Sequence, residues 1–258
     1  MIKNLGSALT EDLKEVCGSS KVVIVHGGGD KVTEIAEKLG KKQTFIKSPS
    51  GIVSRYTDRE TVEIYAMVMA GMINSWLVSY LHKIGINAVG LSGIDGRLIE
   101  AYRKKRLIIL DERGRRRIID GGYTGKITNV NSSLLKLLLD NGYVPVISPV
   151  AIGSEYEILN VDSDRAAANI AGRLGAEKVL FLTDVDGLYI DGKLMSKLTL
   201  EEVKALRGKV GAGMDKKLLA SIEALQNNVK EAIISNGFID HPLRKSLSHE
   251  VGTVITNG

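Results

Sequence analysis

The stretch that most constrains the fold is VVIVHGGGD at residues 22–30. Its four β-branched residues, 22–25, predict a strand buried on both faces, as in a parallel sheet. Three glycines follow, and we expect Asp30 to cap a helix over 31–39. A strand, a glycine turn and a helix N-terminus together form an anion-binding geometry, because free backbone N–H groups and the helix dipole favour negative charge. The alternative is a tight turn that binds nothing.

Two common phosphate-binding motifs do not fit the sequence. The dinucleotide fingerprint G-x-G-x-x-G needs a third glycine where the chain has Val32. The segment GGYTGK at 121–126 is one residue too short for a P-loop, and Ile127 replaces the Ser or Thr that holds magnesium. Any anion site at residues 27–29 therefore belongs to another class.

Composition predicts a globular α/β protein of the cytoplasm. The chain has 258 residues, enough for one large domain or two lobes, and it is 44% hydrophobic and 25% charged. Cys17 is the single cysteine, which excludes an internal disulfide, and no Cys/His group has zinc spacing. We expect no signal peptide in residues 1–10 and no membrane span, because no apolar run approaches about 18 residues.

The positive charge is concentrated in one segment. Residues 97–117 hold nine basic and three acidic residues, a net +6, whereas the whole chain carries +5, so the remainder is −1. Such a patch is typical of a docking surface for an acidic partner. A solvated charged hairpin is the alternative. Nucleic acid is a weaker one, because Tyr102 is the single aromatic residue in the segment.

Alternating strands and helices predict an α/β fold with a mostly parallel sheet. We expect a short strand and a turn over 1–9, a helix over 10–17 capped by Thr10, loops with short extended pieces over 41–54, and a hairpin over 107–119. The remaining helices are predicted at 132–141, 163–173 and 211–226, and the remaining strands at 87–91, 144–150, 179–183, 232–234 and 254–255.

A long helix is predicted after residue 57. The sequence TDRE at 57–60 is a capping box with Thr57 at the cap. An apolar stripe with a spacing of three to four residues then runs from Val62 through Trp76 to Ile84. This stripe is interpreted as core, with an isologous dimer contact as the alternative.

Ligands of parallel sheets bind beyond the carboxyl ends of the strands. The glycine turn, SG at 92–93 and TD at 183–184 all follow predicted strands. The helix that begins near Gly213 carries Lys216 and Lys217 in its first turn, where the helix dipole disfavours positive charge. An anion that neutralises both would explain the arrangement, so we infer a phosphate site; ordinary surface lysines are the alternative.

The chain resembles the amino acid kinase superfamily, which contains acetylglutamate kinase, aspartokinase, glutamate 5-kinase and uridylate kinase. The shared motifs cover nearly the whole length: VHGGG at 25–29, RYTD at 55–58, NVDSD at 160–164, LTDVDG at 182–187 and GMDKK at 213–217. The resemblance implies an open three-layer α-β-α sandwich. It further implies an N-terminal lobe, 1–172, for acid binding and homodimer formation, and a C-terminal lobe, 173–258, for ATP with Mg²⁺.

Position by position, the resemblance also implies roles for individual residues. Lys3 and Lys217 would contact the transferred phosphoryl group, and Asp164 would orient these lysines. The acid substrate or γ-phosphate would be held by Gly27, Gly28, Arg55 and Asn160. The nucleotide would be lined by Gly6, Thr183, Asp184 and Gly187. No side chain is assigned as a metal ligand.

The phosphorylation of a carboxylate, which the resemblance implies, needs no general acid–base catalysis to activate the acid. A carboxylate with a pKa near ~4 is already ionised at neutral pH, so its phosphorylation needs no general base. We accordingly interpret His26 as structural. One departure from the superfamily pattern lies in the first strand, where Leu5 occupies the position of the first glycine. This departure keeps a nucleotide-binding, catalytically weak paralogue open as an alternative.

Within the superfamily, SRYTD at 54–58 and GGYTGK at 121–126 are most similar to the archaeal and Thermus-type kinases of lysine biosynthesis. Those enzymes phosphorylate the side-chain carboxylate of aminoadipate or glutamate attached to the acidic amino-group carrier protein LysW. The resemblance implies that such a carrier docks on Arg103, Lys104, Lys105, Arg106, Tyr123 and Lys126. An N-acetylglutamate kinase of arginine biosynthesis is the alternative. Aminoadipate and glutamate stay unresolved, because they differ by one methylene.

Overall fold

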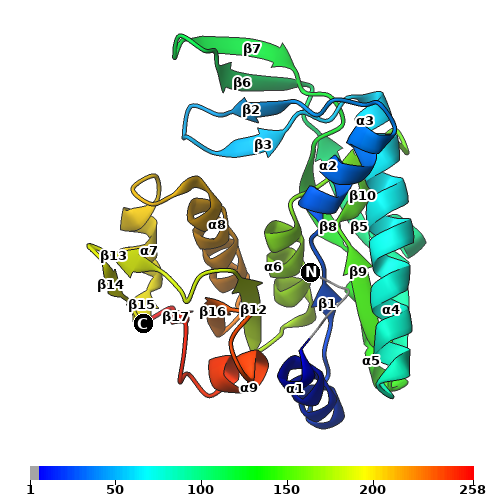
Figure 1. Ribbon diagram of the computed structural model, residues 1–258, viewed down its shortest axis with the longest axis vertical. Helices are drawn as coiled ribbons and strands as arrows, with labels where there is room; N and C mark the ends of the chain where they lie inside the picture. The colour runs from blue at the N-terminus through cyan, green and yellow to red at the C-terminus, as the bar shows by residue number, and fades with distance from the viewer. Residues whose placement is uncertain (1–5) are drawn as a thin grey trace.

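The computed structural model describes residues 6–258, so Lys3 and Leu5 lie outside the described part of the chain. Figure 1 shows two lobes side by side. The N-terminal lobe is built on a parallel sheet of β1 (Ile24–Val25), β9 (Val144–Ser148) and β4 (Ala88–Ser92), with β9 in the middle. All residues of β9 are buried, as expected for the central strand of a covered parallel sheet.

Pro149 ends β9, and the chain continues into a second sheet of the same lobe. Its order is β11 (Ile158–Asn160), β10 (Val150–Ile152), β5 (Ile99–Arg103) and β8 (Gly125–Val130). The pair β10–β5 is parallel, whereas β10–β11 and β5–β8 are antiparallel. The short 3₁₀ helix η3 (Asp95–Arg97) precedes β5. The predicted strand over 144–150 is therefore two strands, divided at the proline.

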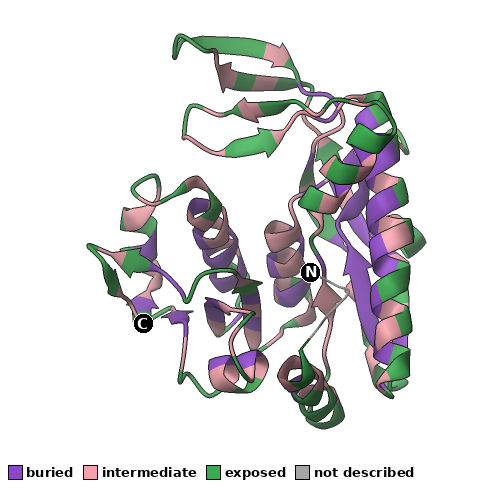
Figure 2. Cartoon of the chain, viewed as in Figure 1, coloured by how far each residue is buried: buried purple, intermediate pink, exposed green. Residues whose placement is uncertain are grey.

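Helices cover both faces of the N-terminal sheets. One face packs against α2 (Gly29–Lys38), α3 (Arg59–Ala66), the π-helical segment η2 (Met67–Ile73) and α4 (Asn74–Lys83). The other face packs against α5 (Ser132–Asp140) and α6 (Ser163–Leu174). The continuous helix Arg59–Lys83 is long and apolar enough to cross a membrane by length and composition. Its apolar side faces the sheet, as Figure 2 shows for the buried residues of α4.

A four-stranded antiparallel sheet projects from the N-terminal lobe, at the top of Figure 1. Its order is β3 (Val53–Arg55), β2 (Phe45–Lys47), β6 (Arg106–Leu110) and β7 (Arg116–Asp120). Register pairs Ile108 with Ile118, and both side chains are exposed. This sheet holds the predicted basic hairpin.

The C-terminal lobe has a mixed sheet ordered β12 (Lys178–Thr183), β16 (Glu231–Asn236), β17 (Thr253–Thr256) and β15 (Lys197–Thr199). The pairs β12–β16 and β15–β17 are parallel, and β16–β17 is antiparallel. A small hairpin, β13 (Tyr189–Ile190) and β14 (Lys193–Leu194), follows β12. The helices are α7 (Leu200–Leu206), α8 (Ala212–Gln226) and α9 (Pro242–Leu247). Only the sheet of β1, β9 and β4 is fully parallel, whereas the second N-terminal sheet and the C-terminal sheet mix parallel with antiparallel pairs, so "mostly parallel" describes the first sheet alone.

Helix α6 belongs to the cores of both lobes. Ala166 and Ile170 pack into the N-terminal core, whereas Ala168 and Ala171 pack with α8 and the C-terminal sheet. The close approach explains Gly172, because a Cβ there would lie 2.4 Å from the Cβ of Asn227. The predicted boundary between residues 172 and 173 stays a prediction, although it falls at the end of this shared helix.

A second link between the lobes is α1 (Ser7–Ser19). Leu13 and Cys17 pack on the N-terminal core beside α4. From the opposite lobe, His241 Nδ1 approaches a carboxylate oxygen of Asp12 at 2.8 Å, and the backbone N–H of Leu243 donates to the other at 2.8 Å. Asp12 is buried and therefore holds α9 against α1.

Three local predictions are wrong. Helix α1 begins at Ser7 rather than at residue 10, so residues 7–9 are helical and not a turn, and Thr10 is not the helix cap. Residues 1–5 of the predicted first strand lie outside the described part of the chain. Strand β1 is short and half-buried because it is the edge strand of its sheet, paired with β9 alone. Helix α2 begins at Gly29 with Gly28 at its N-cap, which places Asp30 inside the first turn without a capping hydrogen bond.

The predicted capping box is also wrong by one residue. Asp58 is the N-cap of α3, and its carboxylate accepts from the N–H of Thr61 at 2.8 Å. The carbonyl of Thr57 instead accepts from the N–H of Tyr123 at 2.7 Å, and this long-range contact holds Thr57 outside the helix. Glu60 pairs with Lys41.

Candidate active site

The glycine turn lies at the carboxyl end of β1. The N–H of His26 continues the parallel ladder by donating to the carbonyl of Ile147 at 3.1 Å. Gly28 has φ +156°, and a Cβ there would lie 2.2 Å from Cδ1 of Ile73. Only glycine fits this position, because both the backbone conformation and the close approach of Ile73 exclude a side chain. The turn opens α2, so its N–H groups combine with a helix N-terminus.

The first turn of α6 lies beside this glycine turn. A Cβ built on Gly27 would be 3.6 Å from the hydroxyl of Ser163. Asp162 caps α6 by accepting from the N–H groups of Asp164 and Arg165, both at 3.1 Å. Two helix N-termini, those of α2 and α6, therefore meet at one place, and both favour an anion there.

Lys217 reaches this place from the C-terminal lobe. Helix α8 begins at Ala212, so Lys217 lies in its second turn, and the predicted placement in the first turn is wrong. Nζ of Lys217 donates to Oδ2 of Asp164 at 3.0 Å. Burial raises the pKa of the Asp164 carboxyl, and the charge of Lys217 opposes part of that rise. The predicted proximity of these two residues is confirmed, while their catalytic roles stay a prediction.

The start of α8 is fixed by a buried carboxylate. Asp215 accepts from Nε and Nη2 of Arg207 at 2.8 and 3.0 Å, and from the N–H of Gly208 at 2.8 Å. These contacts hold the pKa of Asp215 below its usual value. These hydrogen bonds join the loop before α8 to the first turn of the helix. They therefore fix the position of the backbone from which the Lys217 side chain extends toward Asp164.

Arg55 borders the glycine turn on the other side. Its Nη2 donates to the carbonyl of Gly29 at 2.8 Å and to the hydroxyl of Thr33 at 2.9 Å, while Nη1 contacts Gln43. The guanidinium lies 5.1 Å from the centre of the Phe45 ring. Burial lowers the pKa of Arg55. The predicted acid-binding arginine is thus held rigidly where the projecting sheet meets α2.

Asn160 lies on the same side, at the end of β11. Its Nδ2 donates to the buried hydroxyl of Thr57 at 3.0 Å, and its N–H donates to the carbonyl of Tyr123 at 2.9 Å. Thr57 links Asn160 to Arg55, because its hydroxyl donates to the Arg55 carbonyl at 3.4 Å. The structure therefore brings the glycine turn, Arg55, Asn160, Asp164 and Lys217 into one region.

The predicted nucleotide residues lie at the carboxyl edge of the C-terminal sheet. Thr183 ends β12, and its hydroxyl donates to Asp184 at 3.1 Å. Gly187 is buried at φ +155°, and a Cβ there would lie 2.6 Å from the hydroxyl of Thr253. Across the described chain, no hydrogen bond joins this loop to Lys217. Gly6 is exposed at the N-cap of α1.

The predicted docking residues divide into two groups. Arg103 donates to the carbonyl of Gly122 at 2.7 Å and lies 4.2 Å from the centre of the Tyr123 ring, so these two side chains support each other. Lys105, Arg106 and Lys126 are exposed. Lys104 is half-buried, and burial with the neighbouring charge of Arg165 lowers its pKa.

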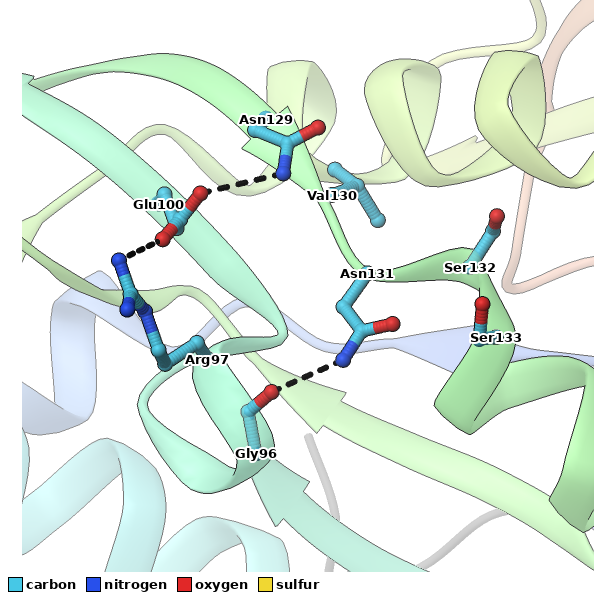
Figure 3. A pocket seen from close by; sticks show the side chains of 8 residues that line it. All are labelled: Gly96, Arg97, Glu100, Asn129, Val130, Asn131, Ser132 and Ser133. Carbon is cyan, nitrogen blue, oxygen red and sulfur yellow. Dashed lines mark hydrogen bonds and ion pairs between the residues drawn. The ribbon is translucent and has the colours of Figure 1, made fainter.

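A separate polar hollow of about 350 Å³ lies between β5, β8 and the start of α5 (Figure 3). Glu100 there pairs with Arg97 and accepts from Asn129 at 3.1 Å, and Asn131 donates to the carbonyl of Gly96 at 3.0 Å. None of the predicted site residues lines it. Its charged groups already satisfy each other, so we assign it no function.

Sequence reasoning missed two buried polar residues of this region. Thr57 was assigned to a helix cap, and Asn74 was not singled out within the apolar stripe. A polar residue inside such a stripe was the available signal for Asn74, because buried amides require partners.

Comparison with known proteins decides the family. Residues 4–236 match the proteins described as the amino acid kinase family. The chain belongs to the amino acid kinase family. A relative from Nitrosopumilus maritimus, named "Putative LysW-aminoadipate/LysW-glutamate kinase", is 54% identical over 255 residues, which cover 99% of this chain and 96% of the relative. A LysW-aminoadipate/LysW-glutamate kinase from Sulfolobus acidocaldarius is 44% identical, with 99% of each chain covered.

Solved structures that superpose on the chain confirm the fold. The protein smu.665 from Streptococcus mutans superposes with a TM-score of 0.80 at 21% identity, covering 100% of this chain and 95% of the other. N-acetylglutamate synthase from Neisseria gonorrhoeae superposes with a TM-score of 0.79 at 24% identity, covering 97% of this chain and 55% of the other. The predicted three-layer α-β-α architecture of an amino acid kinase is therefore correct.

Proposed function

We propose that the protein phosphorylates the side-chain carboxylate of aminoadipate or glutamate carried on a small acidic amino-group carrier protein, using ATP. Two findings support the proposal. The similar kinases named above match the chain over nearly its whole length. The observation in the structure that carries it is the contact of Lys217 with Asp164 beside the glycine turn, at the meeting point of two helix N-termini.

The reaction needs positioning and charge neutralisation. A carboxylate oxygen attacks the γ-phosphorus, a new O–P bond forms, and the bond from phosphorus to the leaving ADP oxygen breaks. The acid is ionised at neutral pH, so no proton has to be removed. The N–H groups of Gly27 and Gly28 and the ammonium of Lys217 stabilise the charge of the transferring group, and Asp164 orients that ammonium. Lys3 is assigned the second ammonium.

Arg55 and Asn160 hold the acid in this scheme. Arg55 keeps its guanidinium in place through Gly29, Thr33 and Phe45, so little side-chain entropy is lost when an α-carboxylate binds. Asn160 uses Nδ2 for Thr57 and has its Oδ1 available for the amide N–H of the linked amino acid. Gly6, Thr183, Asp184 and Gly187 are assigned to the nucleotide.

Magnesium enters as part of the nucleotide substrate. In the described part of the chain, no group of three or more His, Cys, Asp or Glu residues could hold a metal ion. Mg²⁺ is commonly held by phosphate oxygens and water with few protein ligands, which fits such a donor set. We therefore assign the ion to MgATP rather than to a protein site.

Docking of an acidic carrier protein would explain the basic segment over residues 97–117. Half-buried Lys104 and exposed Lys105 lie in the connection from β5 to β6, exposed Arg106 begins β6, and exposed Lys126 lies on β8. These residues lie near Tyr123, whose carbonyl accepts from the N–H of Asn160. An acidic protein would be steered to this surface, and its attached amino acid would reach Arg55 and Asn160. Arg103 and Tyr123 pack on each other and support this surface from beneath.

The assembly and compartment complete the proposal. We assign a homodimer formed through the N-terminal lobe, because Met67 and Trp76 of the long helix are exposed at 58% and 40%. The buried residues of the same stripe, such as Val62, Tyr65 and Met69, belong to the core. We place the protein in the cytoplasm, where ATP and biosynthetic carriers are found. Light scattering of the purified protein tests the dimer.

An ADP-release assay with MgATP tests the function. It compares free N-acetylglutamate with an acidic carrier protein ending in linked aminoadipate or glutamate. Turnover on the carrier alone supports the proposal. Turnover on N-acetylglutamate alone would make the protein an arginine-pathway kinase, and ATP binding without turnover on any acid would favour the catalytically weak paralogue.

A pair of lysine variants gives the assay its control. Lys217→Ala should lower kcat by about 10²–10³-fold, because one preorganised cation at the transferring group is lost. Lys204→Ala, at an exposed lysine of α7, should leave most of the activity. Near-normal turnover of Lys217→Ala with an intact fold would contradict the assigned role.

A further inference from the structure

A buried amide lies beneath the glycine turn. Asn74 is the first residue of α4, directly after the π-helical segment η2, and both Asn74 and His26 are buried. Nδ2 of Asn74 donates to the carbonyl of Val146 at 2.9 Å and lies 3.2 Å from Nε2 of His26. The two hydrogens of one amide nitrogen are thus directed at two fixed partners, His26 directly after β1 and Val146 on β9.

These contacts determine where His26 carries its proton. The carbonyl of Val146 can only accept, so the amide nitrogen of Asn74, not its oxygen, must face it. The same nitrogen faces Nε2 of His26, which must therefore be the unprotonated, accepting atom. Burial lowers the pKa of His26, so the ring is neutral and its proton resides on Nδ1. Nδ1 then donates to the carbonyl of Gly27 at 3.1 Å.

Holding the Gly27 carbonyl also fixes an N–H group. In a planar trans peptide, the carbonyl of one residue and the N–H of the next point in opposite directions. The carbonyl of Gly27 points at the His26 ring, so the N–H of Gly28 points away from it. The hydrogen bond to His26 therefore fixes the orientation of the peptide between Gly27 and Gly28, in a turn that glycine would otherwise leave flexible.

The π-helical segment brings this support into position. Ile73, its last residue, lies directly below Gly28, and Met69 lies beside it, with Sδ 3.1 Å from the Cβ that Gly28 lacks. Asn74 follows at once and needs Gly90 on β4, because a Cβ there would lie 2.1 Å from its Oδ1. π-helical turns are frequent at functional sites. Here the π-helical turn places the apolar side chains of Ile73 and Met69, and the polar side chain of Asn74, beneath the glycine turn.

We propose that His26 and Asn74 are positioning residues of the reaction, and that together they aim the Gly28 N–H at the transferring phosphoryl group. The proposal rests on the proposed function in one respect, because that function assigns the Gly28 N–H to the phosphoryl group. It extends that function to two residues that contact no substrate and act through the peptide between Gly27 and Gly28.

Two matched variants of His26 separate its two hydrogen bonds. His26→Asn places an amide N–H₂ near the position of Nδ1 and keeps a donor for the Gly27 carbonyl. His26→Gln places an amide oxygen near the position of Nε2 and keeps an acceptor for Asn74. We expect His26→Gln to lower kcat by about 10²-fold with little change in the KM for ATP, since a misdirected donor acts in the transition state. His26→Asn should retain most of kcat.

A purely structural histidine would give another pattern. Equal losses in the two variants, or unchanged kcat in His26→Gln, would overturn the proposal. Thermal unfolding of both variants shows whether each is folded before the rates are compared.

Nitrogen NMR of the histidine rings gives a readout that needs no variant activity. Protein labelled with ¹⁵N-histidine contains four such rings, and the His26 signals are those that disappear in His26→Asn. A neutral ring protonated on Nδ1 supports the proposal, and a ring protonated on Nε2 overturns it. This measurement uses the free protein, so it stands even if no acid is phosphorylated, and failure of the proposed function is then seen separately as an inactive wild type.

Discussion

Lys217 and Asp164 form an ion pair of 3.0 Å between α8 and α6, and both side chains are largely buried, at 17% and 22% exposure. The two helices pack along their length, so this pair is one end of the contact between the lobes. Arg165, the next residue of α6, donates from Nε to both carboxylate oxygens of Glu223 on α8 at 3.0 Å. The position of Lys217 is therefore set by the helix pair and not by its own flexible chain.

The ion pair predicts an acid limb in the pH profile of kcat. Asp164 must be ionised to hold Lys217, and burial raises its carboxyl pKa above 3.8. As the pH falls through this raised value, Asp164 becomes protonated and releases Lys217, so kcat should decline at a higher pH than for an ordinary aspartate. Asp164→Asn should have low kcat and lack this limb. An unchanged limb in the variant would assign the titration to another group.

The same shift has the opposite sign for stability. The folded carboxyl binds its proton more tightly than the unfolded one, so Asp164 stabilises the fold below its unfolded pKa and loses this effect as the pH rises through its folded value. Asp164→Asn should therefore gain stability relative to the wild type as the pH rises from 3 to 7. Urea unfolding at several pH values measures the difference. A relative loss over that range would contradict the raised pKa.

The buried contacts of Asp12 predict that its substitution lowers the stability of the fold, although Asp12 lies far from the predicted active region. Its buried carboxylate accepts from the N–H groups of Leu243 and Arg244 at 2.8 and 3.1 Å and contacts His241. Asp12→Ala should lower the free energy of unfolding by about 3 kcal/mol, because backbone N–H groups of the other lobe lose a charged and buried partner. Glu15→Ala is the control, since Glu15 is exposed on the same helix. Similar losses in the two variants would exclude the link.

Local patterns predicted the elements that depend on local chemistry. The hairpin over 107–119 and the helix ending at Gln226 were correct, because turn residues and apolar spacing act within a few positions. The closeness of Asp164 and Lys217 came from the family resemblance, since nothing in the spacing of residues 53 positions apart places them together. The site was thus predictable in its parts but not in its geometry.

Long-range contacts explain what the sequence did not predict. Thr57 has the composition of a cap, yet its carbonyl is taken by Tyr123. Residues 41–54 were expected as loops with short extended pieces, but 45–47 and 53–55 pair as strands and join β6 where Lys47 pairs with Leu110. Asn74 was not singled out within the apolar stripe, and its partners are His26, directly after β1, and Val146 on β9. Each depends on a residue more than 45 positions away.

The close approach of Gly28 and Ile73 predicts that the stability effects of substitutions at these two positions are coupled. Gly28→Ala should destabilise the fold by about 1–3 kcal/mol, because its φ of +156° is strained for alanine and its Cβ would lie 2.2 Å from Cδ1 of Ile73. Ile73→Val removes that Cδ1. The double variant should therefore lose less stability than the sum of the single losses. Gly27→Ala is the control, since its Cβ meets Ser163 at an ordinary 3.6 Å. Additive losses in the double variant would contradict the contact.

The basic segment predicts salt-dependent recognition of the carrier. Lys105→Glu with Arg106→Glu reverses two exposed charges near Tyr123 and should raise the KM for the carrier while leaving the KM for ATP unchanged. Increasing salt should weaken carrier turnover of the wild type, and this dependence should become shallower in the variant, because screening acts on the charges that were reversed. Lys14→Glu with Lys193→Glu makes the same change in net charge on exposed residues elsewhere. An equal effect of both pairs would show that net charge, and not the docking surface, controls the encounter.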